Sequence, residues 1–340
     1  MDTFLQQLVN GLTLGAVYAV VALGYTMVYG IIQLINFAHG EVVMVGSMVA
    51  CSMIGLLAAQ GWSPWLVLLI ATLAAVPACV LLGWLVERVA YRPLRDAPRL
   101  APLITAIGVS IILQHLALLL WTRNPLAFPQ LIPNISYALT ATEGGASISA
   151  IQLVILSLSL LLMTGLLLLV HRTRLGVAMR ATAQNPAVAG LMGVDTHRII
   201  AITFMLGAAL AAIAGVMVGS YYGVAHYGMG SLLGLKAFSA AVLGGIGNIP
   251  GAMLGGLLLG LIEALGAGYI GQLTDLCHWP WLSQSVALLQ QRCADQGNFV
   301  LFGSDYQDVF AFMVLIAVLV LRPSGLLGER VGEQIGRAHV

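Results

Sequence analysis

Charged residues are scarce in this sequence, and lysine is almost absent. Only 8% of the 340 residues are charged, and Lys236 is the one lysine. A soluble globular domain usually carries about 25% charged residues. With 60% hydrophobic residues and a mean hydropathy of +0.97, a water-soluble chain would expose more apolar surface than it can keep dispersed. The composition therefore predicts a protein that lies in lipid, and a net charge of +1 gives no bulk attraction to nucleic acid.

Motifs for catalysis and nucleotide binding are also missing. No G-x-x-x-x-G-K-[ST] surrounds Lys236, so the chain lacks a P-loop, and any ATP hydrolysis has to come from a partner. The zinc pair H-E-x-x-H and the nucleophile elbow G-x-S-x-G are absent too. His39 and Glu41 have the H-x-E spacing of zinc deaminases, but no P-C-x-x-C accompanies them. These absences favour a non-catalytic chain with no cofactor or metal of its own.

Apolar runs extend almost from end to end of the chain. A membrane-spanning helix needs about 20 mostly apolar residues. Nine runs qualify as candidates, at 4–29, 36–59, 64–86, 101–121, 150–170, 199–221, 232–247, 251–270 and 307–321. The seventh and ninth are short, and the seventh also fits a half-helix or re-entrant segment. The sequence predicts an all-α polytopic membrane protein with eight or nine spans, in which residues 1–340 form a single membrane domain.

Basic residues predict the orientation of these spans, because cytoplasmic loops retain Lys and Arg. Eleven of the 14 basic residues lie in three segments: Arg88, Arg92, Arg95 and Arg99; Arg172, Arg174, Arg180 and Arg198; and Arg322, Arg330 and Arg337. Nine crossings place all three segments on one side. The opposite side then carries Asp275, Asp295, Asp305 and Asp308, with Arg292. We expect the N-terminus outside and the C-terminus in the cytoplasm. The start, MDTFLQQLVNG, lacks the positive region of a cleavable signal, so the first span is expected to be retained.

Two apolar runs, 23–47 and 238–260, are interrupted by Gly, Asn or Pro. Many transporters consist of two repeats with interrupted helices near the midplane. Interrupted helices also arise for packing reasons, so a repeat and a packing device both remain open.

Glycines in the second run recur at a spacing of four residues. The pairs are Gly247 and Gly251, Gly251 and Gly255, and Gly256 and Gly260. Small residues at this spacing let helix backbones approach closely in lipid. We therefore expect a bent, tightly packed helix pair rather than a phosphate-binding loop, with Asn248 and Pro250 marking the turn.

The segment RLGVAMRATAQNPAVAGLMGVDTHR (174–198) carries signals for a short helix. Asn185 followed by Pro186 favours a helix start, and Gly193 favours a helix end. Three apolar residues between them share one face: Val188, Leu191 and Met192. So short a helix is marginal alone, so its face is expected to be buried against a neighbour. A helix on the bilayer surface and a coupling helix in a groove of a cytoplasmic ATPase both remain open.

The sequence resembles the LivH-type permease subunits of branched-chain amino-acid ABC importers. The resemblance rests on GLTLGAVYAVVALGYTMVYGIIQLINFAHGEVVMVG, ERVAYRPLR, AIGVSIILQ, the 174–198 segment, GLKAFSAAVLGGIGNIPGAMLGGLLLG and RPSGLLG, which follow the order of the family. It implies the helical permease fold, residence in the bacterial inner membrane, and transport of leucine, isoleucine and valine. It also implies four partners: a second related permease, two cytoplasmic ATPase subunits that bind ATP and Mg, and a periplasmic binding protein.

The resemblance further implies that a cytoplasmic loop at about 171–198 couples the chain to the ATPases. Gly176, Arg180 and Gly193 fit the family pattern best. Together with Arg174, Asn185, Pro186, Val188 and Leu191 they are the expected coupling residues. Alternatives are a permease of the same family for urea or short amides, a stand-alone secondary transporter, and an intramembrane enzyme.

One insertion, at about 271–304, departs from the family pattern, because members usually pass quickly from EAL (263–265) to the segment matching DYQDVFAF (305–312). The parity of the spans places this insertion outside, where disulfides persist. A bond between Cys277 and Cys293 would close a loop of about 16 residues and stabilise the fold by about 3 kcal/mol. Two unpaired thiols are the alternative. Two further cysteines, Cys51 and Cys79, lie in apolar runs and are expected to serve packing.

Three charged residues lie within predicted spans, where charge is costly. Lys236 is expected to extend toward an interface, and Glu263 to approach the outer surface. Glu41 either bonds backbone groups freed by a break at Asn36–Gly40 or lines the substrate route. The residues proposed for a route or gate are Asn36, His39, Glu41 and Asn248.

Overall fold

The structure is a computed structural model and describes residues 2–95, 97–98, 100–133, 135–140, 145–278, 293, 300–303 and 306–328. Nine apolar helices fall on the nine predicted runs: α1 (Asp2–Ile32), α2 (His39–Ala58), α3 (Pro64–Val86), α4 (Leu100–Leu120), α5 (Ala150–Arg172), α8 (Thr196–Tyr222), α9 (Met229–Gly244), α10 (Ile249–Leu273) and α13 (Gln307–Leu321). Among the described residues, seven helices are long and apolar enough to cross a membrane, and α9 and α13 are shorter. The predicted all-α membrane fold is confirmed, including the short seventh and ninth segments.

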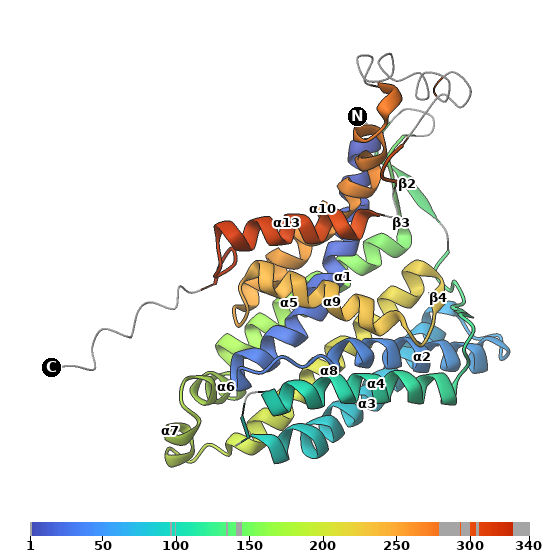
Figure 1. The fold of residues 1–340 in the computed structure, drawn as a ribbon. Coiled ribbons are helices and arrows are strands. Elements are labelled where there is room, and N and C mark those ends of the chain that lie inside the picture. The colour runs from blue at the N-terminus through green and yellow to red at the C-terminus, as the bar shows by residue number, and fades with distance from the viewer. Residues whose placement is uncertain are drawn as a thin grey trace.

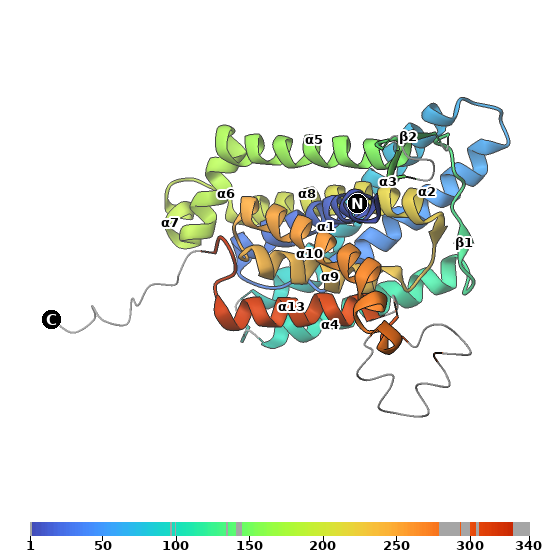
Figure 2. The ribbon, with the colours of Figure 1, turned by 90° about the horizontal axis from the view of Figure 1, so that it is seen from above.

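The helices pack as a bundle around α1 and α8. Figure 2 shows α5 on one flank and α4 with α13 on the other, with α1, α8 and α10 between them. Tyr18, Leu23 and other side chains in the middle of α1 are fully buried. By contrast, α3, α4 and α5 expose large apolar side chains such as Leu73, Leu119 and Leu161. Exposed leucines of this kind suit helices that face lipid.

Glycines set the closest helix contacts in the bundle. A Cβ on Gly260 of α10 would collide with the backbone of Gly15 in α1. Within the α9–α10 pair, a Cβ on Gly251 would collide with the backbone of Gly244, and one on Gly255 with that of α9. The predicted close packing is therefore confirmed for Gly251, Gly255 and Gly260, since no side chain fits at these crossings.

The expectation that Gly247 belongs to this packing is wrong. A Cβ there would meet no atom within 4 Å, and its φ is +92°. Gly247 lies in the turn between α9 and α10, where a left-handed backbone favours glycine. Asn248 and Pro250 mark the end of this turn, as predicted: Asn248 caps α10, and Pro250 lies in its first turn.

A second break separates α1 from α2. Residues 33–38 form no regular structure, and α2 begins at His39 rather than at residue 36. Gln33 has a φ of +52° and is the one described non-glycine residue with a positive φ. Both interrupted runs therefore contain a true helix break, at 33–38 and at 245–248. Whether they descend from one repeat stays a prediction.

Two short antiparallel strand pairs lie at the end of the bundle away from α6 (Arg174–Gln184) and α7 (Pro186–Leu191) (Figure 1). Strand β1 (Leu126–Ala127) pairs with β4 (Val224–Ala225), so the α4–α5 connection is tied to the α8–α9 connection. Strand β2 (Ser136–Ala138) pairs with β3 (Ser147–Ser149).

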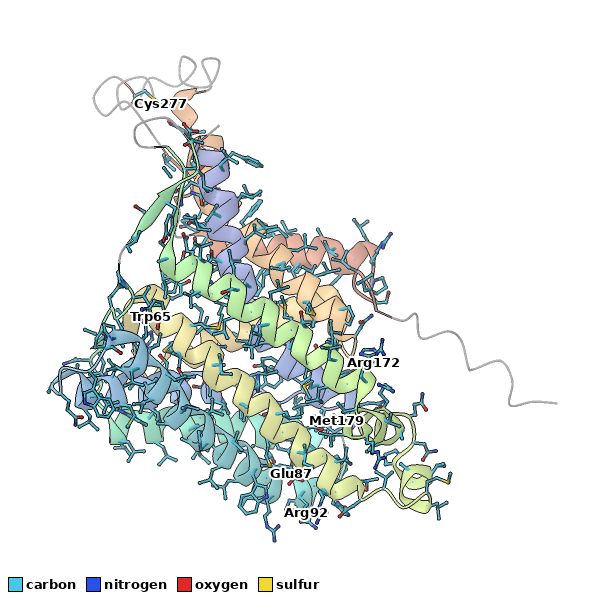
Figure 3. The ribbon with its side chains drawn as sticks, turned by 180° about the vertical axis from the view of Figure 1, so that it is seen from behind. Trp65, Glu87, Arg92, Arg172, Met179 and Cys277 are labelled. Atoms are coloured by element: carbon cyan, nitrogen blue, oxygen red, sulfur yellow. A yellow bond between two sulfur atoms is a disulfide. The ribbon has the colours of Figure 1, made fainter. Side chains whose placement is uncertain are left out.

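Basic connections gather at the opposite end. Figure 3 shows Glu87, Arg92 and Arg172 there, with Trp65 at the far end. Arg95 bonds both Glu87 and His197, which joins the first basic segment to the second. The three basic segments thus share one end as far as the structure describes them; Arg99, Arg292, Asp295, Asp305, Arg330 and Arg337 lie outside the described residues. Which side of the membrane this end faces stays a prediction.

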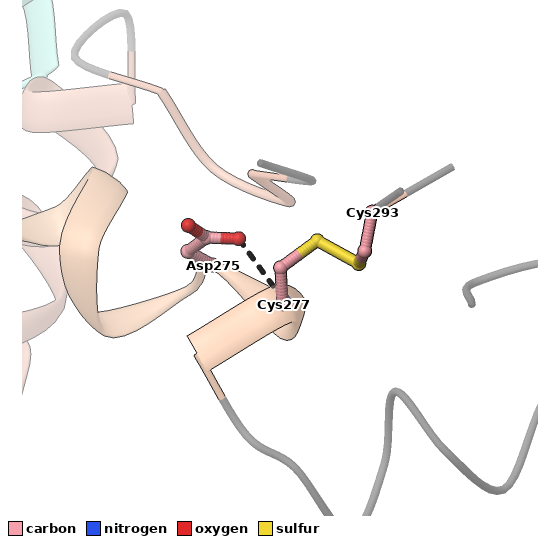
Figure 4. Close-up of a disulfide and its surroundings, with 3 residues drawn as sticks. All are labelled: Asp275, Cys277 and Cys293. Carbon is pink, nitrogen blue, oxygen red and sulfur yellow. Dashed lines mark hydrogen bonds between the residues drawn. A yellow bond between two sulfur atoms is a disulfide. The ribbon is translucent and has the colours of Figure 1, made fainter. Parts of the chain in front are cut away.

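Cysteines occur in two environments. Cys51 and Cys79 are free and buried, as their expected packing role requires. The sulfurs of Cys277 and Cys293 are bonded, with their Cα atoms 5.6 Å apart (Figure 4). Beside them, Asp275 Oδ1 accepts a hydrogen bond from the backbone N–H of Cys277 at 3.0 Å. Most of the rest of the insertion lies outside the described residues.

Candidate functional site

The short helix expected after Asn185 is present as α7. Asn185 Oδ1 accepts hydrogen bonds from the backbone N–H groups of Ala187 and Val188, each at 3.1 Å. Pro186 is the first helical residue, and Gly193 follows the helix with a φ of +87°. Sequence reasoning missed the longer helix α6, which precedes it. The cap at Thr173, whose hydroxyl accepts from Gly176 N–H at 3.1 Å, was the available signal.

The apolar face of α7 is not buried against any described part of the chain. The exposed fractions of its side chains are 52% for Val188, 87% for Leu191 and 81% for Met192. A helix of six residues is marginal by itself and gains stability when its apolar face is packed against another surface. The chain therefore presents this face for contact with something outside itself.

Helix α6, which precedes α7, packs on the end of α5. A Cβ on Gly176 would collide with the carbonyl oxygen of Val170, so α6 packs directly on the end of α5. Arg180 donates a hydrogen bond to that same carbonyl, which would otherwise be a free group at a helix C-terminus. The side chain of Met179, also on α6, is buried. Gly176 and Arg180 thus join α6 to the end of α5, and α7 begins two residues after α6 ends.

The far end of the segment is fixed as well. Asp195 Oδ1 accepts a hydrogen bond from the backbone N–H of Arg198 at 3.1 Å, which caps α8. This bond, helped by the nearby positive charge of Arg198, holds the pKa of Asp195 below its ordinary value. The segment from Thr173 to Asp195 is therefore capped at both ends, and α7 projects between them (Figure 1).

The second candidate group lies at the break before α2. Asn36 Oδ1 accepts from Ala38 N–H at 3.2 Å and from the Tyr91 hydroxyl at 3.0 Å. His39 packs against Tyr25 with ring centroids 4.7 Å apart, and its Nε2 has no partner. The break is thus stabilised by the Asn36 amide.

Glu41 is almost completely buried, with 1% of its surface exposed. Its Oε1 accepts a hydrogen bond from the Ser110 hydroxyl at 3.1 Å, and its Oε2 has no partner. The expectation that Glu41 bonds backbone groups freed by the break finds no support in these contacts, because Asn36 does so instead.

Asn248 lies apart from these residues, in the α9–α10 turn. Its Oδ1 accepts from Gly251 N–H at 3.3 Å, and its Nδ2 donates to the Leu327 carbonyl at 2.7 Å. Backbone bonds from Leu326 and Leu327 to Leu243 and Gly244 reinforce the same contact. These bonds give Asn248 a structural part in holding the segment after α13.

A buried ion-pair network lies between α9, α10 and α13, and the sequence did not predict it. Lys236 Nζ lies 2.8 Å from Glu263 Oε1 and 2.7 Å from Asp308 Oδ1, and the Tyr18 hydroxyl donates to Glu263 Oε2 at 3.0 Å. The expectations for Lys236 and Glu263 are both wrong: their side chains are 8% and 2% exposed. Charges on separate helices neutralise one another here, so neither has to reach an interface. No local sequence pattern marks such a pair.

The described residues contain no group of three or more His, Cys, Asp or Glu side chains able to hold a metal.

Residues 7–319 match the family described as branched-chain amino acid transport system / permease component. The chain belongs to this family. The match runs from α1 into α13, so it includes α6, α7, Glu41 and the Lys236 network.

Curated relatives agree with the family. The permease is 47% identical over 333 residues to the high-affinity branched-chain amino acid transport system permease protein BraD of Pseudomonas aeruginosa, with 98% of each chain covered. It is 42% identical over 334 residues to the corresponding protein LivH of Escherichia coli K12, again with 98% of each chain covered. A probable branched-chain amino acid transport permease protein of Methanocaldococcus jannaschii is 28% identical over 57% of this chain. No solved structure matches the permease.

Proposed function

We propose that this permease is the membrane subunit of an ATP-driven importer of leucine, isoleucine and valine in the bacterial inner membrane. Its partners are a second related permease, two cytoplasmic ATPase subunits that bind ATP and Mg, and a periplasmic binding protein. Support comes from the family description and from the names of BraD and LivH, which match the whole length of the chain.

The exposed face of α7 is the observation that carries this proposal. The chain has no P-loop of its own, so the energy of ATP has to arrive as mechanical movement from a partner. The apolar face of α7 would sit in a groove of that partner and receive the movement. The hydrogen bond from Arg180 to the Val170 carbonyl would then pass the movement to α5. The basic end of the bundle, where α7 lies, is then the cytoplasmic end.

The permease moves its substrate inward by alternating access. An aliphatic zwitterion needs passage walls that bind it weakly, because tight binding would prevent its release. Most discrimination between amino acids therefore falls to the periplasmic binding protein.

Co-purification with the ATPase subunits tests the proposal. Leu191→Asp places a charge on the most exposed residue of the α7 face, where it leaves the fold intact because nothing packs against it. Val177→Asp is the matched control, since Val177 is also exposed but lies on α6. We expect the wild type and Val177→Asp to retain the ATPase in mild detergent and Leu191→Asp to lose it.

Reconstitution completes the test. Vesicles with all subunits should take up labelled leucine only when ATP is supplied, and excess urea should not compete. Uptake without ATP would identify a secondary transporter instead. Competition by urea would move the permease to the urea and short-amide branch of the family. Retention of ATPase and uptake by Leu191→Asp would remove α7 from the mechanism.

A further inference from the structure

One face of the bundle carries polar side chains in the middle of a span. In Figure 1, α2 runs between α9 and α4 on this face. Gln114, in the second half of α4, lies near the start of α9, where a Cβ on Gly228 would be 3.7 Å from its Nε2. Ser231 is exposed and donates to the Gly228 carbonyl at 3.2 Å. Polar groups at this depth face water or protein rather than lipid.

Glu41 is buried behind this face, near the start of α2. The hydroxyl of Ser110, one turn before Gln114, donates a hydrogen bond to Glu41 Oε1. Glu41 Oε2 is buried without a partner. A Cβ on Gly230 of α9 would lie 2.5 Å from Oε2, so this oxygen points at the bare backbone of α9. Among the described residues Glu41 belongs to no ion pair, and Lys236, on the same helix α9, is engaged by other carboxylates.

A buried carboxylate with one bare oxygen is costly unless a donor or cation reaches it. Glycines of α2 and α9 form the contact that covers Glu41. A Cβ on Gly40 would collide with the Gly230 carbonyl, and one on Gly234 would lie 3.0 Å from the Gly40 Cα. Backbone packs on backbone here without interlocking side chains. Movement of α9 away from α2 would therefore uncover Oε2 at this contact, while the Phe238 ring would part from Phe37.

Toward the Gly245–Asn248 turn the same side of α9 becomes apolar. A small hollow there is lined by Tyr25, Tyr29, Ile35, Phe238, Ala241 and Ile246. Phe238 follows Ser231 by two helical turns, so the hollow continues the line of the polar side chains. Its apolar lining suits a branched aliphatic side chain better than a charged one.

We propose that the face formed by α2, α4 and α9 lines the substrate pathway, and that Glu41 receives the α-ammonium group of the amino acid when α9 moves away from α2. This inference rests on the proposed transport function. The second permease closes the other side of the pathway. An ammonium group supplies both the positive charge and the hydrogen bonds that Oε2 lacks.

Cysteine accessibility tests the first half of the proposal in the assembled importer. Gln114→Cys places a thiol on the polar side of α4, and Ile112→Cys places one at nearly the same depth on an exposed apolar position. The native Cys51 and Cys79 are buried and give little background. During ATP-driven turnover, a charged, membrane-impermeant thiosulfonate should modify Gln114→Cys at least tenfold faster than Ile112→Cys. Equal rates would overturn the assignment of this face.

Substitution of Glu41 tests the second half. In vesicles holding all subunits, Glu41→Gln should lower leucine uptake per ATP hydrolysed at least tenfold, with Glu41→Asp intermediate. Thr13→Val is the control, because it removes a buried hydroxyl whose hydrogen bond, to the Val9 carbonyl, stays within α1, and it should leave that ratio unchanged. An unchanged ratio in Glu41→Gln would overturn the ammonium site.

Two further outcomes are informative. Dissociation of the two permeases by Glu41→Gln would mean that a cationic side chain of the second permease occupies Oε2, which also overturns the proposal. Absence of ATP-dependent leucine uptake in the wild type would instead contradict the proposed function. Accessibility of Gln114→Cys keeps the test valid if Glu41→Gln fails to assemble, because that variant retains Glu41.

Discussion

Lys236 Nζ lies 2.8 Å from Glu263 Oε1 in the interior of the bundle, and this pair joins α9 to α10. Asp308 extends the network to α13 and Tyr18 extends it to α1. The network around the chain's only lysine thus links the consecutive helices α9 and α10 to α1 and α13, which are distant from them in the sequence.

Lys236→Met should destabilise the permease by about 3 kcal/mol, because it leaves the Glu263 carboxylate buried without its counter-charge. Thermal unfolding in detergent measures the loss. The double variant Lys236→Met/Glu263→Gln should recover part of it, since no uncompensated buried charge remains at Glu263. If the single variant unfolds like the wild type, the network contributes nothing to stability.

The α1–α10 crossing makes a second prediction. Gly260→Ala adds a methyl group against the backbone of Gly15, which cannot rotate away, so the helices have to separate. Overpacking of this kind costs about 1–3 kcal/mol. Gly165→Ala is the control, because a Cβ on this α5 glycine meets nothing within 4 Å. We expect it to be neutral or stabilising by about 0.5–1 kcal/mol. Equal unfolding temperatures for both variants would refute the close crossing.

Asn185→Ala removes the cap of α7 and should cost about 1 kcal/mol locally. Hydrogen exchange of residues 186–192 should then accelerate, and leucine uptake per ATP should fall while the bundle stays folded. Asn185→Asp preserves the capping oxygen and should restore both readings. Faster exchange without any loss of coupling would show that the order of α7 is irrelevant to transport.

The Cys277–Cys293 bond closes a segment with a sequence separation of 16. A loop of this length corresponds to about 3 kcal/mol of stabilisation in the chain-entropy account. Without reductant, a maleimide applied to the folded permease should label neither cysteine, and after reduction it should label both. Labelling of both thiols before reduction would contradict the pairing and the external location inferred for the insertion.

Features set by local chemistry were accessible from the sequence. Long apolar runs indicated the helices, Asn185–Pro186 indicated the start of α7, and the glycine spacing indicated the α9–α10 packing. Each of these depends on residues within a few turns of one another. The resemblance to a permease family supplied the transport function, which composition alone left open.

Features set by distant contacts were not accessible. Lys236 and Glu263 are separated by 27 residues, and only the folded bundle brings them together. Gly247 has the spacing of a packing glycine, yet its backbone conformation assigns it to a turn. The partner of Glu41 was also out of reach, because Ser110 lies on another helix, 69 residues away.

The cytoplasmic position of α7 is the claim on which the transport account depends most directly. Ala187 is exposed on this helix. In right-side-out vesicles, Ala187→Cys should resist a membrane-impermeant maleimide, and in inverted vesicles it should react unless the ATPase subunits are bound. Reaction in right-side-out vesicles alone would place α7 outside the cell and contradict the account.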